Sequence, residues 1–237
     1  MSIIDKLLVL FDDEKSRTLM DVKNIFPSFT KQVLSSSLGR ISAKGFLIKN
    51  KSNGRYVITS IGRKKITDEL ENLKKFEERE RSNHCRFVIF NIPEAQRVSR
   101  DLMRIFLVNN GYIRIHNTVW INFYSDKTRL EEIIAELKIN NQILTFEAEI
   151  NKQYIDDIYK YIHCDFTLLH KEYSDFIKKA QSFIKLKKKN QFDAQCLVFD
   201  FSKIIKKDPT LPKQYLSKTY NGFKAYELYS RIRQYCY

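Results

Sequence analysis

The first 65 residues combine three apolar patterns of helical spacing with two short β-like runs. Apolar residues recur every three to four positions over 3–11, over 19–26, and over a third segment from about 28 to 44 that ends before Gly45. Two strand-like runs follow at 46–48 and 56–59, separated by a polar turn at 51–55. Three helices and then a hairpin are the order of a winged helix-turn-helix, which is the predicted fold of residues 1–65.

The third helix is predicted to have one buried face and one small, polar face. The buried face consists of Val33, Leu34, Ser37, Leu38 and Ile41. The outward face, with its basic edges, consists of Lys31, Gln32, Ser35, Ser36 and Arg40. Such a face fits closely into a major groove, where Gln and Arg reach base edges and Ser reaches phosphates. A solvated helix face with no ligand is the alternative interpretation.

The hairpin behind that helix has a basic tip. Its side chains of interest are Lys49, Lys51, Asn53 and Arg55, and Asn53-Gly54 supplies the turn chemistry. A wing of this composition is expected to follow the phosphate backbone beside the minor groove, which positions a protein without selecting sequence. The predicted DNA contacts are therefore these four residues and the five on the third helix.

Positive charge is concentrated on this module. Residues 1–65 contain 13 Lys and Arg against 5 Asp and Glu, in a chain of 237 residues with a net charge of +14. RNA, anionic lipid, or no charged partner at all are alternatives for a basic protein. Concentration on one recognisable module favours duplex DNA.

The middle of the chain alternates strands and helices in a recognisable order. Residues 66–83 are predicted to form a polar linker helix with mixed charges. After it come a strand at 86–90, a helix at 94–109, strands at 112–116 and 118–123, a helix at 127–138 and a strand at 144–148. The first of these helices has apolar positions at Leu102, Ile105, Phe106 and Val108. The β-α-β-β-α-β order predicts a ferredoxin-like domain over 84–150, with dimerisation as its expected role.

Residues 151–237 are predicted to be a helical domain. An apolar stripe runs from Leu168 to Phe183, and two further helices are expected at 195–205 and 222–233 with a proline-containing breaker at 208–212 between them. The predicted fold class is therefore α+β in three domains joined by one linker helix. A ligand pocket between the middle and C-terminal domains, lined by Trp120, Tyr173 or Phe176, is weighed against a role of these aromatic residues in the core.

The sequence offers little chemistry for catalysis or metal binding. The four cysteines are dispersed, which is typical of a reducing compartment. His84-Cys85 and His163-Cys164 are adjacent pairs, whose side chains diverge on a strand, and Asp156-Asp157 diverge on a helix. No metalloprotease, nucleophile-elbow or phosphate-loop motif occurs. We therefore expect no metal, no cofactor and no enzymatic activity. No apolar run approaches the ~20 residues of a membrane helix, and a cytoplasmic location is expected.

Three motifs in order resemble those of the PaaX-like family. The first is Val88-Ile89-Phe90-Asn91-Ile92-Pro93-Glu94, with Arg97, Arg100-Asp101 and Arg104 after it, then Gly111 and Val119-Trp120-Ile121. The others are Asp208-Pro209-Thr210-Leu211-Pro212 and the segment from Tyr220 to Leu228. The family usually has Trp-Pro-Gly where this chain has Tyr220-Asn221, and the effector contacts stay unassigned. The resemblance implies a winged-helix transcriptional repressor, a homodimer on a palindromic operator, released by an effector of the acyl-coenzyme A type.

Two other classes remain as alternatives. The middle domain resembles the small nuclease-like subunit of CRISPR adaptation complexes, in which an Asp after the first strand can hold a metal. Asn91 stands at the matching position, and a neutral amide cannot supply the charge that binds Mg²⁺ tightly. A protein-interaction adaptor, whose winged helix binds protein, is the third class, because fold alone does not decide function.

Overall fold

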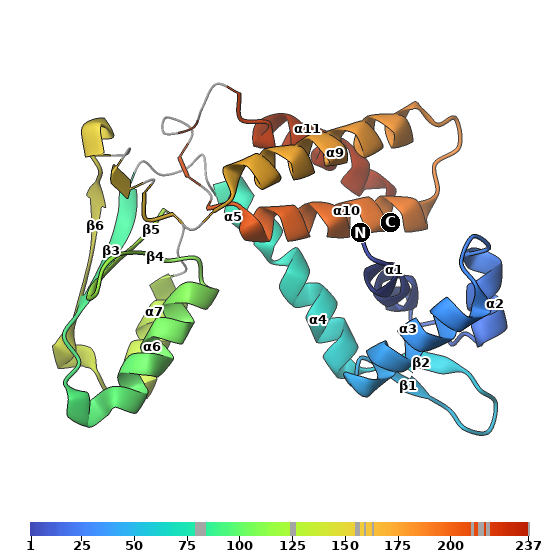
Figure 1. Ribbon diagram of the computed structural model, residues 1–237, viewed down its shortest axis with the longest axis horizontal. Coiled ribbons are helices and arrows are strands. Elements are labelled where there is room, and N and C mark those ends of the chain that lie inside the picture. Colours follow the sequence, from blue (N-terminus) through green and yellow to red (C-terminus); the bar gives the residue numbers. More distant parts are fainter. Residues whose placement is uncertain are drawn as a thin grey trace. The chain divides into compact units, whose positions relative to one another are not determined.

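The computed structural model describes the chain except residues 79–83, 124–126, 155–156, 159, 163, 210, 213–215, 217–218 and 237. The chain divides into two compact units (Figure 1). Unit 1 comprises Met1–Leu73, His170–Lys206 and Asn221–Tyr237, and unit 2 comprises Lys74–Leu169 and Lys207–Tyr220. His163, Asp156 and Thr210, which belong to motifs noted in the sequence, lie outside the described residues.

Unit 1 begins with the three helices and hairpin of a winged helix. The elements are α1 (Ile3–Leu10), α2 (Leu19–Ile25), α3 (Lys31–Ala43), β1 (Leu47–Lys49), β2 (Tyr56–Ile58) and α4 (Ser60–Leu70). A Ser or Thr hydroxyl caps the N-terminus of each of these four helices, from Ser2, Thr18, Thr30 and Thr59. β1 and β2 are antiparallel, and Arg17 extends the hairpin by a bridge to Tyr56.

The inner face of α3 packs on α1 and α2 with one exception to the predicted set. Leu34, Ser37, Leu38 and Ile41 are buried, whereas Val33 is 43 % exposed. Val33 lies about 100° around the helix from Leu34, which places it at the edge of the buried stripe. The prediction that Val33 faces the core is therefore wrong.

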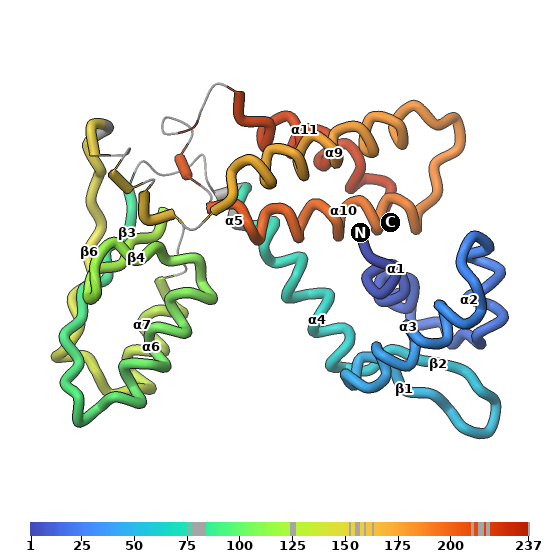
Figure 2. Tube along the Cα trace, viewed as in Figure 1, coloured from blue at the N-terminus to red at the C-terminus, as the bar shows by residue number. Residues whose placement is uncertain are grey.

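Three long helices near the C-terminus complete unit 1. They are α9 (Phe166–Lys185), which begins in unit 2, α10 (Gln191–Lys207) and α11 (Gly222–Ile232). The N-terminus and Cys236 both lie at α10 (Figure 2): the N-terminal amine is 3.4 Å from Asp200, and the side-chain amide of Gln191 donates to the Cys236 carbonyl at 2.8 Å. Phe199 of α10 belongs to the same buried cluster as the winged-helix core, so N- and C-terminal segments share one core.

Unit 2 is built on a four-stranded antiparallel sheet. Its strands are β3 (His84–Phe90), β4 (Ile113–His116), β5 (Val119–Asn122) and β6 (Ile143–Glu149), in the spatial order β4-β5-β3-β6. Two of its helices, α6 (Arg97–Asn109) and α7 (Lys127–Glu136), lie on one side of the sheet (Figure 1). This order is that of a ferredoxin-like fold, and the predicted α+β class is confirmed. The predicted helix over 66–83 consists of the end of α4 and of α5 (Asn72–Glu78) as far as the chain is described.

Each face of the sheet carries its own hydrophobic cluster. Val88 and Trp120 pack under the helices with Met103 and Leu107 of α6, whereas Cys85 packs on the opposite face with Ile158 and Ile162. The apolar positions that the sequence pattern picks out in α6 are different residues: Leu102, Ile105, Phe106 and Val108. Leu102, Ile105 and Val108 are exposed, because Met103 and Leu107 occupy the side that faces the sheet.

In the part of the chain that the structure describes, no helix is both long enough and apolar enough to cross a membrane.

Candidate nucleic-acid interface

The outward face of α3 is open along its length. All five predicted contacts on this helix, Lys31, Gln32, Ser35, Ser36 and Arg40, are exposed. The helix begins at Thr30, whose hydroxyl accepts a hydrogen bond from the Val33 amide at 3.3 Å. Gly39 lies on the same face, and a side chain there would meet no atom within 4 Å. The result is a helix surface of small side chains with a cation near each end, as close approach to a groove requires.

The α2–α3 turn is fixed by a residue that was not among the predicted site residues. The ammonium of Lys23 donates to the carbonyl oxygens of Pro27 and Phe29, at 2.8 and 2.7 Å. A Lys in the last turn of a helix commonly satisfies free carbonyls in this way. The position of Lys23 near the end of the second predicted helix was the feature of the sequence that could have indicated this role. Lys23 therefore positions α3 rather than contributing a cation to its outer face.

The wing is an ordered turn held by its own asparagines. The Asn50 carboxamide accepts from the Ser52 amide at 2.9 Å, and the Asn53 carboxamide accepts from the Arg55 amide at 3.1 Å. Gly54 has a φ of 66°, in the left-handed region that glycine adopts without steric cost. Lys49, Lys51 and Asn53 are exposed, so the turn presents cations on a defined backbone.

Arg55 differs from Lys49 and Lys51 because its side chain has polar partners outside the wing. Its guanidinium donates to the Ser16 carbonyl at 2.9 Å and lies 3.9 Å from the Asp21 carboxylate. The backbone amide and hydroxyl of Thr18 bond to Asp21 and lower its pKa, so this carboxylate stays charged beside Arg55. Arg55 thus ties the wing to the start of α2 while it remains exposed.

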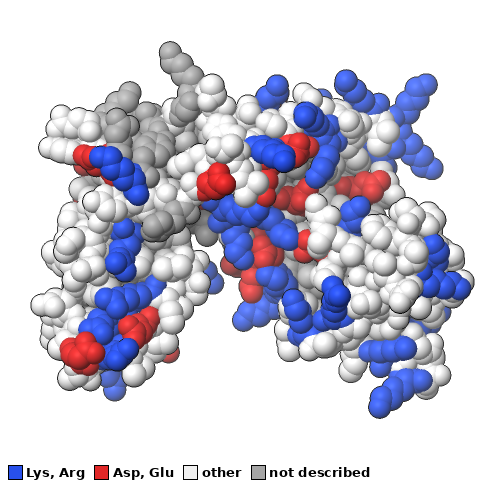
Figure 3. Space-filling model, viewed as in Figure 1, with Lys and Arg blue, Asp and Glu red and all other residues white. Residues whose placement is uncertain are grey.

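Most of the other cations of this surface form no such internal contact within the described residues, whereas the Lys49 ammonium lies 5.5 Å from the centre of the Tyr56 ring. Among the described residues, no carboxylate lies within ion-pair distance of Lys31, Arg40 or Lys51. Lys44, which was not among the predicted contacts, is also exposed just after α3. Figure 3 shows Lys and Arg side chains over the hairpin and its surroundings. The surface can therefore attract phosphates without first breaking internal ion pairs.

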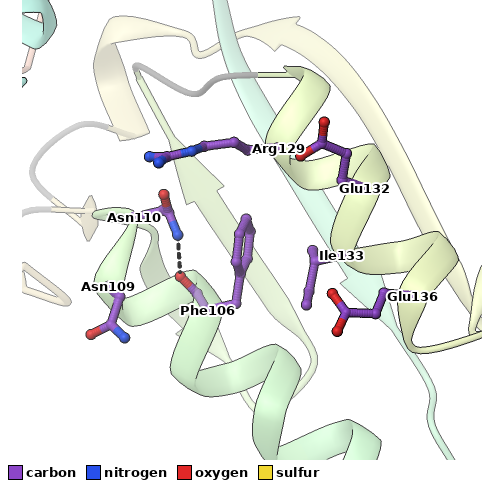
Figure 4. Close-up of a pocket in the computed structure, with 7 residues that line it drawn as sticks. All are labelled: Phe106, Asn109, Asn110, Arg129, Glu132, Ile133 and Glu136. Carbon is purple, nitrogen blue, oxygen red and sulfur yellow. Dashed lines mark hydrogen bonds between the residues drawn. The ribbon is translucent and has the colours of Figure 1, made fainter.

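Two cavities lie among the described residues of unit 2, and neither is lined by the aromatic residues considered from the sequence. One, of about 420 Å³, lies between α6 and α7, where Phe106 and Ile133 face each other beside Asn110 and Arg129 (Figure 4). The other, of about 610 Å³, has Phe87, Ile115, Ile150 and Ile158 among its lining residues. Trp120, Tyr173 and Phe176 are buried, at 3 % exposure or less, and pack in the cores.

The residues near Asn91 do not form a metal centre. Asn91 follows β3, and its backbone amide donates to the Gln142 carbonyl at 2.9 Å. Glu94 pairs with Arg100 at 2.6 Å, and Asp101 lies 3.4 Å from Arg104, so both carboxylates already have cationic partners. Within the described ranges, no three His, Cys, Asp or Glu residues are grouped to hold an ion.

Two of the cysteine thiols are shielded from solvent by burial. Burial raises the pKa of Cys85 to about 12 and that of Cys196 to about 12. Both groups are therefore protonated near neutral pH and poor nucleophiles.

The fold and this surface define a winged-helix protein with an added ferredoxin-like unit. Two family descriptions match the chain: "PaaX protein central Cas2-like domain" over residues 79–158 and "PaaX-like protein C-terminal domain" over residues 160–237. The chain belongs to the PaaX family, whose members are typically transcriptional repressors and generally not enzymes.

A solved structure shares the fold. The "Uncharacterized protein Rv0674 from Mycobacterium tuberculosis" is similar at 12 % identity with a TM-score of 0.50, over 88 % of this chain and 84 % of that one. No match was found among the curated proteins. At this identity the likeness concerns the fold alone.

Proposed function

We propose that this protein is a sequence-specific repressor of transcription that binds duplex DNA through α3 and the wing. The observation that carries the proposal is the exposure of all nine predicted contacts on one basic module. α3 would enter the major groove, with Gln32 and Arg40 at base edges, and the wing would lie along phosphates. Family membership supports the same function.

The active species in this proposal is a homodimer on a palindromic operator. A chain with one recognition helix reads one half-site, and two-fold symmetry of the protein then matches the symmetry of the operator. An effector of the acyl-coenzyme A type would release the complex. The 610 Å³ cavity offers an apolar floor for the acyl group, with Tyr154 and Tyr161 among its lining residues.

The central experiment measures binding to DNA fragments selected from the source genome, at several salt concentrations. We expect Lys51→Ala to weaken binding to all sequences and to lower the slope of log K against log salt by about one unit. Lys188→Ala is the matched control: it removes the same charge from the exposed α9–α10 connection, which belongs to neither α3 nor the wing. If both changes weakened binding equally, Lys51 would contribute only through the overall charge of the protein. If Lys51→Ala had no effect, the proposed contact between the wing and DNA would be refuted.

Sequence reading is tested separately on α3. Gln32→Ala and Arg40→Ala should relax the preference for the selected fragments over random duplex, by about 1–3 kcal/mol for each base that the side chain would otherwise read. Competition binding with both DNAs measures this preference. Wild-type protein that binds selected and random duplex equally, or binds neither, would contradict the proposal and favour an adaptor.

The effector is tested with a panel of acyl-coenzyme A thioesters and the matching free acids. The measurement is the change in melting temperature of unit 2 within the full-length protein. Glu149, Asp157 and Lys160 also line the cavity; Lys160 pairs with Asp157 at 2.6 Å, and the charge of Glu149 opposes the phosphates of coenzyme A. We therefore expect the acyl group to occupy the cavity and the nucleotide to lie outside it. Ile115→Trp, which fills the floor, should abolish the shift; a shift that survives this change would place the effector elsewhere.

A further inference from the structure

The cavity between α6 and α7 has charged groups of opposite sign along its length. Its volume of about 420 Å³ is near the lower end of the range for small-molecule sites. Phe106 of α6 and Ile133 of α7 form its apolar walls, and Arg129 and Glu136 line it on either side of Ile133 (Figure 4). The proposed function makes no use of this cavity, which shares no lining residue with the 610 Å³ cavity.

The lining residues of α7 follow one face of that helix. Arg129, Glu132, Ile133 and Glu136 are spaced i, i+3, i+4 and i+7. Arg129 and Glu136 are therefore about 10 Å apart along the helix axis, since each residue adds a rise of about 1.5 Å. Among the described residues, no Lys or Arg lies within ion-pair distance of Glu132 or Glu136, whereas their neighbour Glu131 pairs with Lys127. The two glutamates can therefore attract a cation from outside the chain.

The Arg129 end of the cavity combines a cationic donor with a neutral acceptor. The Asn110 carboxamide donates through its nitrogen to the Phe106 carbonyl at 2.8 Å, and its oxygen points to the side on which the Arg129 guanidinium lies (Figure 4). Arg129 also has contacts within the chain, but a guanidinium offers five N–H donors and can bind a carboxylate as well. The carboxamide oxygen can accept from an ammonium group. Together the two side chains match the α-carboxylate and α-ammonium of an amino acid.

We propose that this cavity binds a free α-amino acid with a basic side chain. The α-carboxylate lies at Arg129 and the α-ammonium at the Asn110 oxygen. The methylene chain, about four carbons long in lysine, packs between Phe106 and Ile133. The side-chain cation lies at Glu136, and Glu132 adds negative charge to the same wall. The ligand thus repeats the order of the lining groups, with a charged group at each end of an apolar middle.

The test is isothermal titration calorimetry of the full-length protein with lysine, ornithine and arginine, and with three analogues of lysine that each lack one group. Norleucine lacks the side-chain ammonium, ε-aminocaproate lacks the α-ammonium, and cadaverine lacks the carboxylate. We expect saturable binding of a basic amino acid, and binding at least about 10-fold weaker for each analogue of lysine, as the loss of a charge-assisted hydrogen bond predicts. Norleucine that binds as tightly as lysine, or no saturable binding of any of the three amino acids, would overturn the inference.

A pair of variants on α7 assigns the binding to this cavity. Glu136→Gln changes an exposed residue, so the fold should persist, and it should weaken lysine binding about 10-fold while norleucine binding stays the same. Glu131→Gln is the matched control, because Glu131 is exposed on the same helix but does not line the cavity. A circular dichroism spectrum of each variant checks folding. Lysine binding that is kept in Glu136→Gln and lost in Glu131→Gln would contradict the assignment.

A charge reversal tests the orientation of the ligand. The double variant Glu132→Lys with Glu136→Lys should lose lysine binding and gain binding of α-aminoadipate, which carries a carboxylate at the far end of its side chain. A double variant that still prefers lysine would show that the side-chain cation lies elsewhere, against the proposal. These titrations contain no DNA, so a protein that binds lysine but no DNA would refute the proposed function and leave this site standing.

Discussion

At the scale of single residues, the junction between the wing and α4 depends on a glycine. The Thr59 hydroxyl donates to the Gly45 carbonyl at 2.6 Å and accepts from the Gly62 amide at 3.0 Å. A Cβ on Gly62 would collide with the carbonyl oxygen of Phe46 and come within 2.9 Å of Ile58. Backbone cannot yield as a flexible side chain does, so only glycine fits at this position.

We expect Gly62→Ala to lower the free energy of unfolding by about 1–3 kcal/mol, as overpacking does. Gly39→Ala is the matched helical control, because a Cβ there meets nothing within 4 Å. It should raise stability by up to about 1 kcal/mol through helix propensity. Urea titrations of both variants measure whether each change raises or lowers the free energy of unfolding. If Gly62→Ala left this free energy unchanged, α4 would be shown to shift freely against the hairpin.

Residue patterns in the sequence predicted much of α3 and misjudged α6. The stripe of α3 was predicted correctly at Leu34, Leu38 and Ile41, because only one side of that helix is apolar. α6 has apolar residues on two sides, so spacing alone cannot tell which side meets the sheet. Val33 shows the same limit at the edge of a stripe.

At the scale of elements, α10 is attached to the winged helix by ion pairs as well as by its core packing. Lys203 lies 2.8 Å from Asp5 of α1, and Lys206 lies 3.3 Å from Glu69 of α4. Lys65 binds the same Glu69 oxygen at 2.5 Å. The sequence predicted these helices but not their partners, since an amphipathic pattern shows that a face is buried without showing what covers it.

These pairs predict a dependence of stability on pH. Burial raises the pKa of Glu69, but the bonds and charges of Lys65 and Lys206 outweigh it and the net shift is downward; Asp5 follows the same pattern with Lys203 and Ser2. A lowered pKa in the folded state means that the unfolded chain binds more protons in acid. The stability that these ion pairs contribute is therefore fully present above about pH 5. It is lost as the pH falls toward the lowered pKa values of Glu69 and Asp5 in the folded protein.

We expect Glu69→Gln to destabilise the protein at pH 7 by about 1.5–3 kcal/mol, the range for a hydrogen bond to a charged group. It should also flatten the loss of stability between about pH 5 and pH 3, because its titration is removed. Urea midpoints at each pH measure both effects. Glu132→Gln, on the exposed side of α7, is the control; an unchanged pH profile in Glu69→Gln would show that this carboxylate is not linked to folding.

At the scale of the whole molecule, each of the two units has its own core, and the only tryptophan of the chain lies in one of them. Trp120 is buried in the cluster of unit 2 with Val88 and Met103. Phe199 lies in the cluster of unit 1, where it joins α10 to the winged helix. Indole fluorescence therefore reports on unit 2, whereas the helical circular dichroism signal comes mainly from the longer helices of unit 1.

We expect Phe199→Ala to move the circular dichroism transition to lower denaturant, by about 3–5 kcal/mol for a buried aromatic side chain, and to leave the Trp120 fluorescence transition in place. Met103→Ala should do the opposite, with a cost of about 2–5 kcal/mol confined to the fluorescence signal. The pair of variants separates the two cores because each probe is the control for the other. If Phe199→Ala shifted both signals equally, the two units would unfold as one cooperative body, and the DNA binding proposed for unit 1 would then be coupled through stability to any ligand of unit 2.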